Sequence, residues 1–191
     1  MIYLASRSPR RAELLQQIKV PFCWVNAKIE ECQKSNELAK DYVLRLAIEK
    51  AQAGFLNSDK RYPVLGADTI VVIDGEVLGK PKNELHARHM MEKLSAQTHQ
   101  VFTAVALFDG QKTSSVIVAT SVTFKALCAD EIADYWQSGE PKDKAGGYAI
   151  QGFASKFITH INGSYSAVVG LPLYESDQLI KKFLRGTHHV S

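Results

Sequence analysis

The segment PVLGADTIVVIDG, residues 63–75, decides the fold class of this chain. Pro63 to Ile73 forms an apolar run with the length and composition of a buried strand, interrupted at Gly66 and Asp68. The pair Asp74-Gly75 follows directly and favours the positive φ angles of a tight hairpin turn. A buried strand that runs into a hairpin predicts a sheet that is not purely parallel.

Strand and helix patterns alternate on both sides of this segment. Further strands are predicted over residues 2–5, 20–27, 100–108, 114–127 and 156–161. Helices are predicted from Ser8-Pro9 onward and over residues 36–55, 83–96, 130–138 and 174–185, with Asp41 placed to pair with Arg45. Asp109-Gly110 and Asn162-Gly163 are two more hairpin signals. The sequence therefore predicts an α/β protein with a strongly twisted mixed β-sheet and flanking helices.

The composition is that of an ordinary globular protein. Of 191 residues, 46% are hydrophobic, which is enough for one domain over residues 1–186 with a flexible tail over 187–191. The formal net charge of +3 is too small to indicate a nucleic-acid-binding protein. The sequence contains no apolar run of the kind that indicates a signal peptide or a membrane span. The three cysteines have no CxxC spacing, so we expect reduced thiols in a cytoplasmic protein.

Asp68 is a charged residue in an apolar strand. A buried carboxylate costs several kcal/mol unless it is paired or holds a cation. Lys80 follows the hairpin and can return to the neighbourhood of Asp68, whereas Lys50 lies on a helix and is unremarkable by itself. The alternative is a structural aspartate that is bonded to backbone N–H groups.

The segment SRSPRR, residues 6–11, places positive charge at the start of a helix. Hydroxyls of Ser6 and Ser8, the guanidinium groups of Arg10 and Arg11 and the helix N-terminus all favour an anion, and their spacing suits a polyphosphate. The alternative is an exposed basic turn without a ligand.

The glycine-rich segment DKAGGYAIQG, residues 143–152, predicts a loop that approaches a ligand closely. It is not a Walker A sequence, and no GxGxxG follows a strand. Together with Asp68 and the basic segment, it indicates a site for a polyanion and a divalent cation. Mg²⁺ needs only one or two carboxylates where phosphates complete its coordination shell.

These segments, in order, resemble the Maf family of nucleoside triphosphate pyrophosphatases. The resemblance rests on LASRSPRRAELL, RLAIEKA, GADTIVV, LGKP and DKAGGYAIQG, and it extends from about residue 2 to residue 185. It implies an inosine-triphosphatase-like fold with a cleft between two lobes, a homodimer, and hydrolysis of nucleoside triphosphates to monophosphate and pyrophosphate with Mg²⁺, Mn²⁺ or Co²⁺.

The resemblance also implies roles for individual residues. Asp68 matches the catalytic proton acceptor, and the cation is expected beside Asp68 and Glu31. Whether Asp68 is base, metal ligand or both is open at this point. The positions expected to bind substrate are Ser6, Ser8, Arg10, Arg11, Glu31, Lys50, Thr69, Lys80 and Gln151.

Three of these positions imply the branch of the family that acts on dTTP and UTP. Relatives that act on 7-methyl-GTP tend to have Trp, Gln and Glu where this chain has Arg10, Thr69 and Gln151. A neutral amide at Gln151 can both donate to and accept from a uracil or thymine edge. Arg7 departs from the small residue that is usual there.

Three alternatives remain. A purine-selecting enzyme on the same fold disagrees with Arg10, Thr69 and Gln151, and a nucleic-acid-binding protein has only one short basic cluster in its favour. A nucleotide-binding regulator of cell division with little catalysis is the main alternative to an enzyme.

Overall fold

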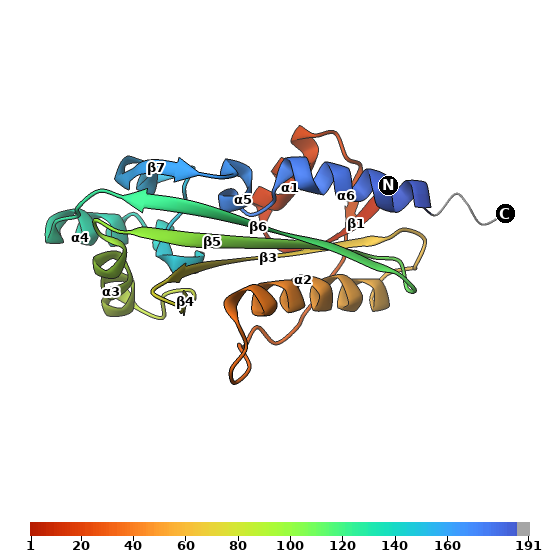
Figure 1. The fold of residues 1–191 in the computed structure, drawn as a ribbon, viewed down its shortest axis with the longest axis horizontal. Helices are drawn as coiled ribbons and strands as arrows, with labels where there is room; N and C mark the ends of the chain where they lie inside the picture. The colour runs from red at the N-terminus through yellow and green to blue at the C-terminus, as the bar shows by residue number, and fades with distance from the viewer. Residues whose placement is uncertain (187–191) are drawn as a thin grey trace. The chain divides into compact units, whose positions relative to one another are not determined.

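The computed structural model describes residues 1–186, and the predicted tail over 187–191 lies outside the described residues (Figure 1). The elements are β1 (Ile2–Ala5), α1 (Pro9–Gln17), β2 (Phe22–Trp24), α2 (Ala39–Leu56), β3 (Val64–Ile73), β4 (Glu76–Leu78), α3 (Glu84–Leu94), β5 (Thr98–Phe108), β6 (Thr113–Phe124), α4 (Ala129–Gln137), the 3₁₀ helices η1 (Glu140–Asp143), η2 (Ala145–Gly147) and η3 (Phe153–Phe157), β7 (Ile158–Asn162), α5 (Tyr165–Val169) and α6 (Leu173–Gly186). Within this part of the chain, no helix combines the length and the apolar character that a membrane span requires.

The strands form a seven-stranded mixed sheet in the order β2-β1-β3-β5-β6-β7, with β4 paired to β3. β1 is parallel to both β2 and β3, whereas the pairs β3–β4 and β6–β7 are antiparallel. Asp74 and Gly75 have φ angles of 50° and 78°, as a tight hairpin turn requires. The predicted mixed α/β fold is confirmed.

The predicted hairpin at Asn162-Gly163 is wrong, because these residues lead from β7 into α5 instead of into a strand. Gly163 has a φ of 132°, and a Cβ there would lie 2.8 Å from Thr120 Oγ1. The Ser164 amide donates to the same Thr120 hydroxyl at 3.0 Å. The glycine therefore serves a close contact at the start of a helix.

Two predictions about helices need correction as well. The helix predicted over 36–55 begins at Ala39, and Asn36 has a positive φ of 58° that no helix allows. Arg45 pairs with Glu37 and Glu49, not with the predicted Asp41. The starts at Ser8-Pro9 and Asn83 are confirmed, and Asn83 accepts a hydrogen bond from the His86 amide.

The chain divides into two compact units. The first contains Met1–Asp68, Thr103–Val118 and the chain from Gly170 on, and the second contains Thr69–Phe102 and Ala119–Val169. The single domain predicted over 1–186 stays a prediction.

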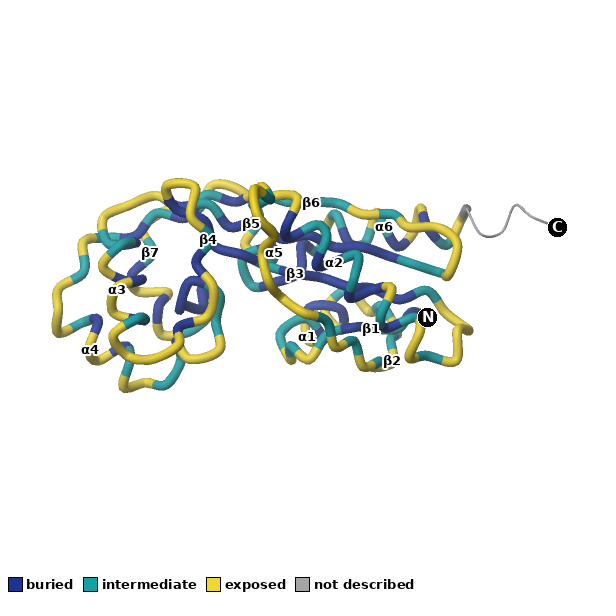
Figure 2. Tube along the Cα trace, turned by 90° about the horizontal axis from the view of Figure 1, so that it is seen from below, coloured by how far each residue is buried: buried dark blue, intermediate teal, exposed yellow. Residues whose placement is uncertain are grey.

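In the first unit, α2 packs directly on the strands (Figure 1). A Cβ on Gly66 of β3 would lie 2.3 Å from the carbonyl oxygen of Ala47 and 2.5 Å from the amide nitrogen of Ala51. Only glycine allows the backbones of helix and strand to approach this closely. Figure 2 shows β1 as a buried strand, and Ile2 and Leu4 have no exposed surface.

The second unit has an apolar core of its own. α3 and α4 lie side by side (Figure 1) and contribute Met90, Met91 and Tyr135 to it. Phe124 of β6 and Phe157 of η3 are buried among these side chains. This core also takes in Tyr148 and Ile150 of the glycine-rich segment.

Candidate active site

A lysine between two carboxylates forms the centre of the site in the first unit. Lys50 Nζ lies 2.6 Å from Asp68 Oδ1 and 2.8 Å from Glu31 Oε1. Lys50 and Asp68 are each only 7% exposed. The hydrogen bond between them identifies the buried partner of Asp68 as Lys50.

The packing of α2 explains why these groups meet. Side chains two residues apart in a strand share a face, so Asp68 lies on the same face of β3 as Gly66. The bare backbone at Gly66 receives α2 between Ala47 and Ala51, and this stretch carries Lys50. The glycine therefore brings the lysine to the carboxylate.

Two residues of α2 hold the irregular segment that carries Glu31. The Tyr42 hydroxyl donates to the Glu31 carbonyl at 3.0 Å, and Arg45 Nη2 donates to the Cys32 carbonyl at 2.9 Å. Arg45 also binds Glu37 through two nitrogens, at 2.5 and 2.7 Å. Neither contact with this segment was predicted from the sequence.

The basic segment after β1 is a structured helix start. Ser6 Oγ accepts from the Ser8 amide at 3.2 Å and from Arg11 Nη1 at 3.3 Å, and Arg11 Nε donates to the Gly170 carbonyl at 2.9 Å. Ser8 begins α1 but makes no side-chain cap bond, and Arg10 is half-buried. Arg7 is exposed and reaches Asn26 at 3.4 Å. The alternative of an exposed basic turn therefore applies to Arg7 but not to Arg11.

The pKa values link the basic segment to the carboxylates. Loss of solvent lowers the pKa of Arg11, Arg10 lowers it further, and Asp68 and Glu31 oppose the shift. Burial raises the pKa of Tyr42 to about 12, and Asp68 and Glu31 add to that shift. Arg10, Asp68 and Glu31 therefore all influence the charge of Arg11.

The remaining predicted residues, Thr69, Lys80 and Gln151, belong to the second unit. Thr69 is half-buried, whereas Lys80 and Gln151 are exposed. The residue before Lys80 is tied to the glycine-rich segment, because the Gly146 amide donates to the Gly79 carbonyl at 3.0 Å.

The glycine-rich segment itself is more ordered than the predicted loop. It passes through η1 and η2, and Tyr148, Ala149 and Ile150 are buried. Gly146 has a φ of 65°, and a Cβ there would meet Val71 at 2.8 Å. The close approach that Gly146 allows is therefore to the protein's own strand β3.

A buried histidine that was not predicted as a functional residue supports this segment. His99 Nε2 lies 2.7 Å from the Tyr148 hydroxyl, and burial lowers the pKa of His99 to about 4. Among the described residues, none hydrogen-bonds His99 Nδ1. His99 is therefore neutral near pH 7. Its neighbours in the sequence, Thr98 and Gln100, gave no signal of this role.

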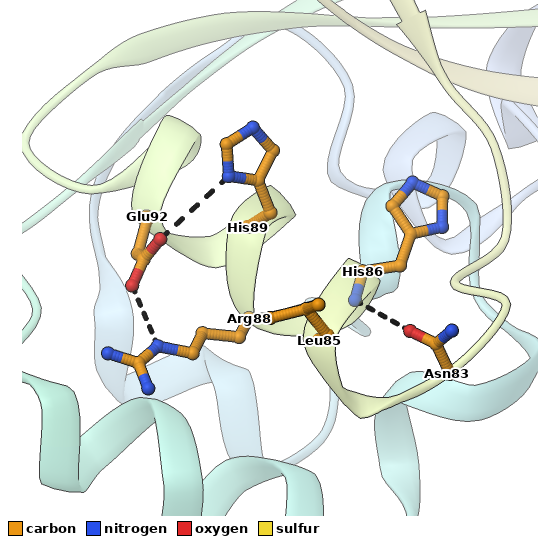
Figure 3. A pocket seen from close by; sticks show the side chains of 6 residues that line it. All are labelled: Asn83, Leu85, His86, Arg88, His89 and Glu92. Carbon is orange, nitrogen blue, oxygen red and sulfur yellow. Dashed lines mark hydrogen bonds and ion pairs between the residues drawn. The ribbon is translucent and has the colours of Figure 1, made fainter.

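A hollow of about 600 Å³ lies over α3 and contains none of the predicted site residues. Its polar side chains bond mainly to one another or to their own helix: Arg88 with Glu92 at 2.8 Å, and Asn83 with the His86 amide (Figure 3). This arrangement is that of a solvated helix face.

The donor set can be tested against a divalent cation. Within residues 1–186, no three His, Cys, Asp or Glu side chains cluster as metal ligands. Asp68 and Glu31 supply hard oxygen donors, and Lys50 already bridges them. Two carboxylates suit Mg²⁺ only where phosphate oxygens and water complete its shell. The residues therefore fit a cation that arrives with a phosphorylated substrate.

Comparisons with known proteins found chains that are similar over nearly the whole length of this one. The chain is 56% identical over 185 residues to a protein named dTTP/UTP pyrophosphatase from Pseudoalteromonas translucida, covering 97% of this chain and 98% of that protein. A protein of the same name from Shigella dysenteriae is 55% identical over 182 residues, covering 95% and 92%. The solved structure of the Staphylococcus aureus Ham1 protein matches with a TM-score of 0.54 at 14% identity, covering 97% of this chain and 98% of that one. That likeness concerns the fold alone.

The family model described as "Maf-like protein" matches residues 1–183. This range includes the lysine-bridged carboxylates, the basic helix start and the glycine-rich segment. The chain belongs to the Maf family.

Proposed function

We propose that this chain hydrolyses nucleoside triphosphates, preferably dTTP and UTP, to the monophosphate and pyrophosphate in the cytoplasm. The observation that carries the proposal is the buried Asp68, which Lys50 holds and which interacts electrostatically with Arg11. The relatives at 55–56% identity over nearly the whole chain carry the name of this activity.

Each residue of the first unit has a defined task in this proposal. Arg10 and Arg11 bind phosphate oxygens at the N-terminus of α1, where the helix dipole adds to their attraction. Lys50 fixes the Asp68 carboxylate through Oδ1. Asp68 orients the attacking water and accepts its proton, while pyrophosphate leaves opposite to it.

A bound divalent cation, held by Asp68 and Glu31 with the phosphates, would supply neutralisation of phosphate charge and a more acidic water. Lys50 then lies next to both carboxylates and offsets charge that develops on the phosphates. In the second unit, Lys80 provides a further cation for the triphosphate. Thr69 and Gln151 select the base.

The test is pyrophosphate release from a panel of nucleoside triphosphates with Mg²⁺, Mn²⁺ or Co²⁺. We expect dTTP and UTP to be turned over fastest, and Asp68→Asn to lower kcat by about 10² or more, because a positioned acid–base group is lost. Asp41→Asn, an exposed carboxylate on α2, is the matched control and should leave kcat unchanged. Normal turnover in a folded Asp68→Asn protein would remove Asp68 from the chemistry. Tight binding without turnover in the wild type would favour the regulator instead.

Substrate preference is tested at Gln151. Gln151→Glu should lower kcat/KM for dTTP and UTP relative to 7-methyl-GTP, because a carboxylate cannot donate to a pyrimidine carbonyl. Gln137→Glu, at an exposed position of α4, is the control. The same substrate ranking in both variants would contradict the role of Gln151.

A further inference from the structure

Gln151 occupies an exposed turn between two anchored pieces of backbone. The Gly152 amide donates to the Ala149 carbonyl at 3.1 Å and closes the turn. Tyr148, Ala149 and Ile150 are buried on one side, and Ala154 is fully buried on the other. The direction of the Gln151 side chain therefore depends on how firmly the backbone is held at both ends.

Glu140 holds the end that follows Gln151. Its Oε2 accepts from the Phe153 amide at 2.8 Å, and its Oε1 accepts from the Ala154 amide at 3.2 Å. Tyr135 donates its hydroxyl to the same Oε1 at 2.8 Å. One carboxylate from η1 thus connects α4 to the first two amides of η3.

Gly152 is the residue that makes this contact possible. A Cβ at Gly152 would lie 1.9 Å from Glu140 Oε2 and 2.6 Å from Glu140 Cδ. Its φ of −107° is open to other residues, so the requirement is for space and not for conformation. Any side chain at this position would displace the carboxylate from the amides.

The surroundings keep the contact rigid. Tyr135 has no exposed surface, and its ring stacks on Phe153 with centroids 5.7 Å apart. Burial and the hydrogen bond to Glu140 raise the pKa of Tyr135, so its hydroxyl remains a donor. Lys156 Nζ lies 4.1 Å from the centroid of the Phe153 ring.

We infer that Glu140 is a positioning residue for base selection: it fixes the backbone beside Gln151 and thereby the orientation of the Gln151 amide toward a pyrimidine edge. This inference rests on the proposed function. It assigns the specificity of the segment to a carboxylate that does not touch the substrate.

The first experiment measures kcat/KM for UTP and GTP in the wild type, Glu140→Ala, Glu140→Gln and Glu131→Ala. The ratio of the two values is independent of the fraction of folded enzyme. We expect Glu140→Ala to lower the UTP preference by about 10-fold or more, because displacement of a contact group by about 1 Å has effects of this size. Glu140→Gln keeps carbonyl acceptor capacity and should recover part of the preference.

Glu131 is the matched control. It also accepts a backbone hydrogen bond, from the Cys128 amide at 3.2 Å at the start of α4, and it pairs with Lys125. Glu131→Ala therefore removes an equivalent cap in the same unit and should leave the UTP preference unchanged. A loss of preference in this variant equal to that in Glu140→Ala would overturn the inference, because a lost cap alone would then explain the effect.

A second arm places Glu140→Ala in a Gln151→Ala background. If Glu140 acts through Gln151, the second substitution should change the preference little further. Full additivity would overturn the inference. Amide hydrogen exchange of Phe153 and Ala154 must also increase in Glu140→Ala, and unchanged exchange would overturn it as well.

Equilibrium binding distinguishes this inference from the proposed function. The ratio of Kd for UTP and GTP is measured in an Asp68→Asn background, where turnover does not interfere. Absence of hydrolysis in the wild type with a Kd ratio that still depends on Glu140 would refute the hydrolase and retain the inference. Hydrolysis by the wild type together with a Kd ratio that Glu140→Ala leaves unchanged would support the hydrolase and refute the inference.

Discussion

Replacing Lys50 with methionine is the most direct test of the ion group. The substitution keeps a long apolar stem but removes the ammonium that lies 2.6 Å from Asp68 and 2.8 Å from Glu31. Asp68 is 7% exposed, so its carboxylate cannot turn into solvent without movement of β3 or α2. The variant therefore leaves a buried carboxylate without its bonded cation.

The expected cost follows from this burial. Removal of one partner from a buried ion pair destabilises a protein by about 3–5 kcal/mol. The Glu31 side chain is 45% exposed and can be solvated, so its contact with Lys50 adds little. Arg11 interacts electrostatically with Asp68 and offsets part of the loss. We expect a decrease of about 3 kcal/mol in the free energy of unfolding.

Urea denaturation at pH 7 measures the change. The set comprises Lys50→Met, Asp68→Asn, the double variant and the control Lys182→Met. Lys182 is an exposed lysine on α6, so its substitution should change the free energy of unfolding by no more than about 0.5 kcal/mol. The double variant should be more stable than the sum of the single changes predicts, by about 2 kcal/mol, because the uncompensated carboxylate is gone. Additive single effects, or a Lys50→Met protein as stable as the wild type, would refute the reasoning.

Two further predictions concern packing and pH. Gly66→Ala places a Cβ 2.3 Å from the Ala47 carbonyl oxygen, so the backbone of β3 or α2 must move. Urea denaturation should show a loss of about 1–3 kcal/mol or more in the free energy of unfolding, and pyrophosphate release should fall because Lys50 moves away from Asp68. In the control Gly79→Ala, the new Cβ meets nothing within 4 Å, and a similar loss of stability there would contradict the argument. Burial lowers the pKa of His99 from 6.5 to about 4, so the folded state binds a proton at His99 less readily than the unfolded chain does. The stability that neutral His99 contributes is therefore complete above pH 6.5 and is lost as the pH falls toward 4. The loss, about 3 kcal/mol at 1.36 kcal/mol per pKa unit, should appear in denaturation curves of the wild type and be largely absent in His99→Gln; parallel pH profiles would exclude His99 as the source.

The sequence allowed prediction of features that depend on neighbouring residues. Asp74-Gly75 predicted a hairpin because both positions need a positive φ, and Asn83 predicted a helix start because its side chain bonds an amide three residues on. Asp68 was identified because a charge in an apolar strand has to be compensated. Each of these signals lies within a few residues of its cause.

Contacts between distant residues could not be predicted in this way. The helical spacing of Asp41 and Arg45 predicted an ion pair, but Arg45 bonds to Glu37 in the preceding segment as well as to Glu49. The sequence did not show which groups approach Gly66 and Gly152: these are a helix backbone at Gly66 and the Glu140 carboxylate at Gly152. Lys50 reaches Asp68 because α2 packs on Gly66, so nothing in the sequence around Lys50 indicated that it is the partner of Asp68.

The stability of the fold does not account for the ion group at Lys50. A buried ion pair is often no more stabilising than apolar side chains of the same volume, because both charges lose their hydration. Tyr42, Val43, Leu46 and Ala47 show that α2 already packs its buried face with apolar residues, and one more would suit the same site. The chain instead places a lysine between two carboxylates that also interact electrostatically with Arg11 of α1. Packing alone would not favour this choice, whereas the proposed binding of a phosphorylated substrate would use these charges.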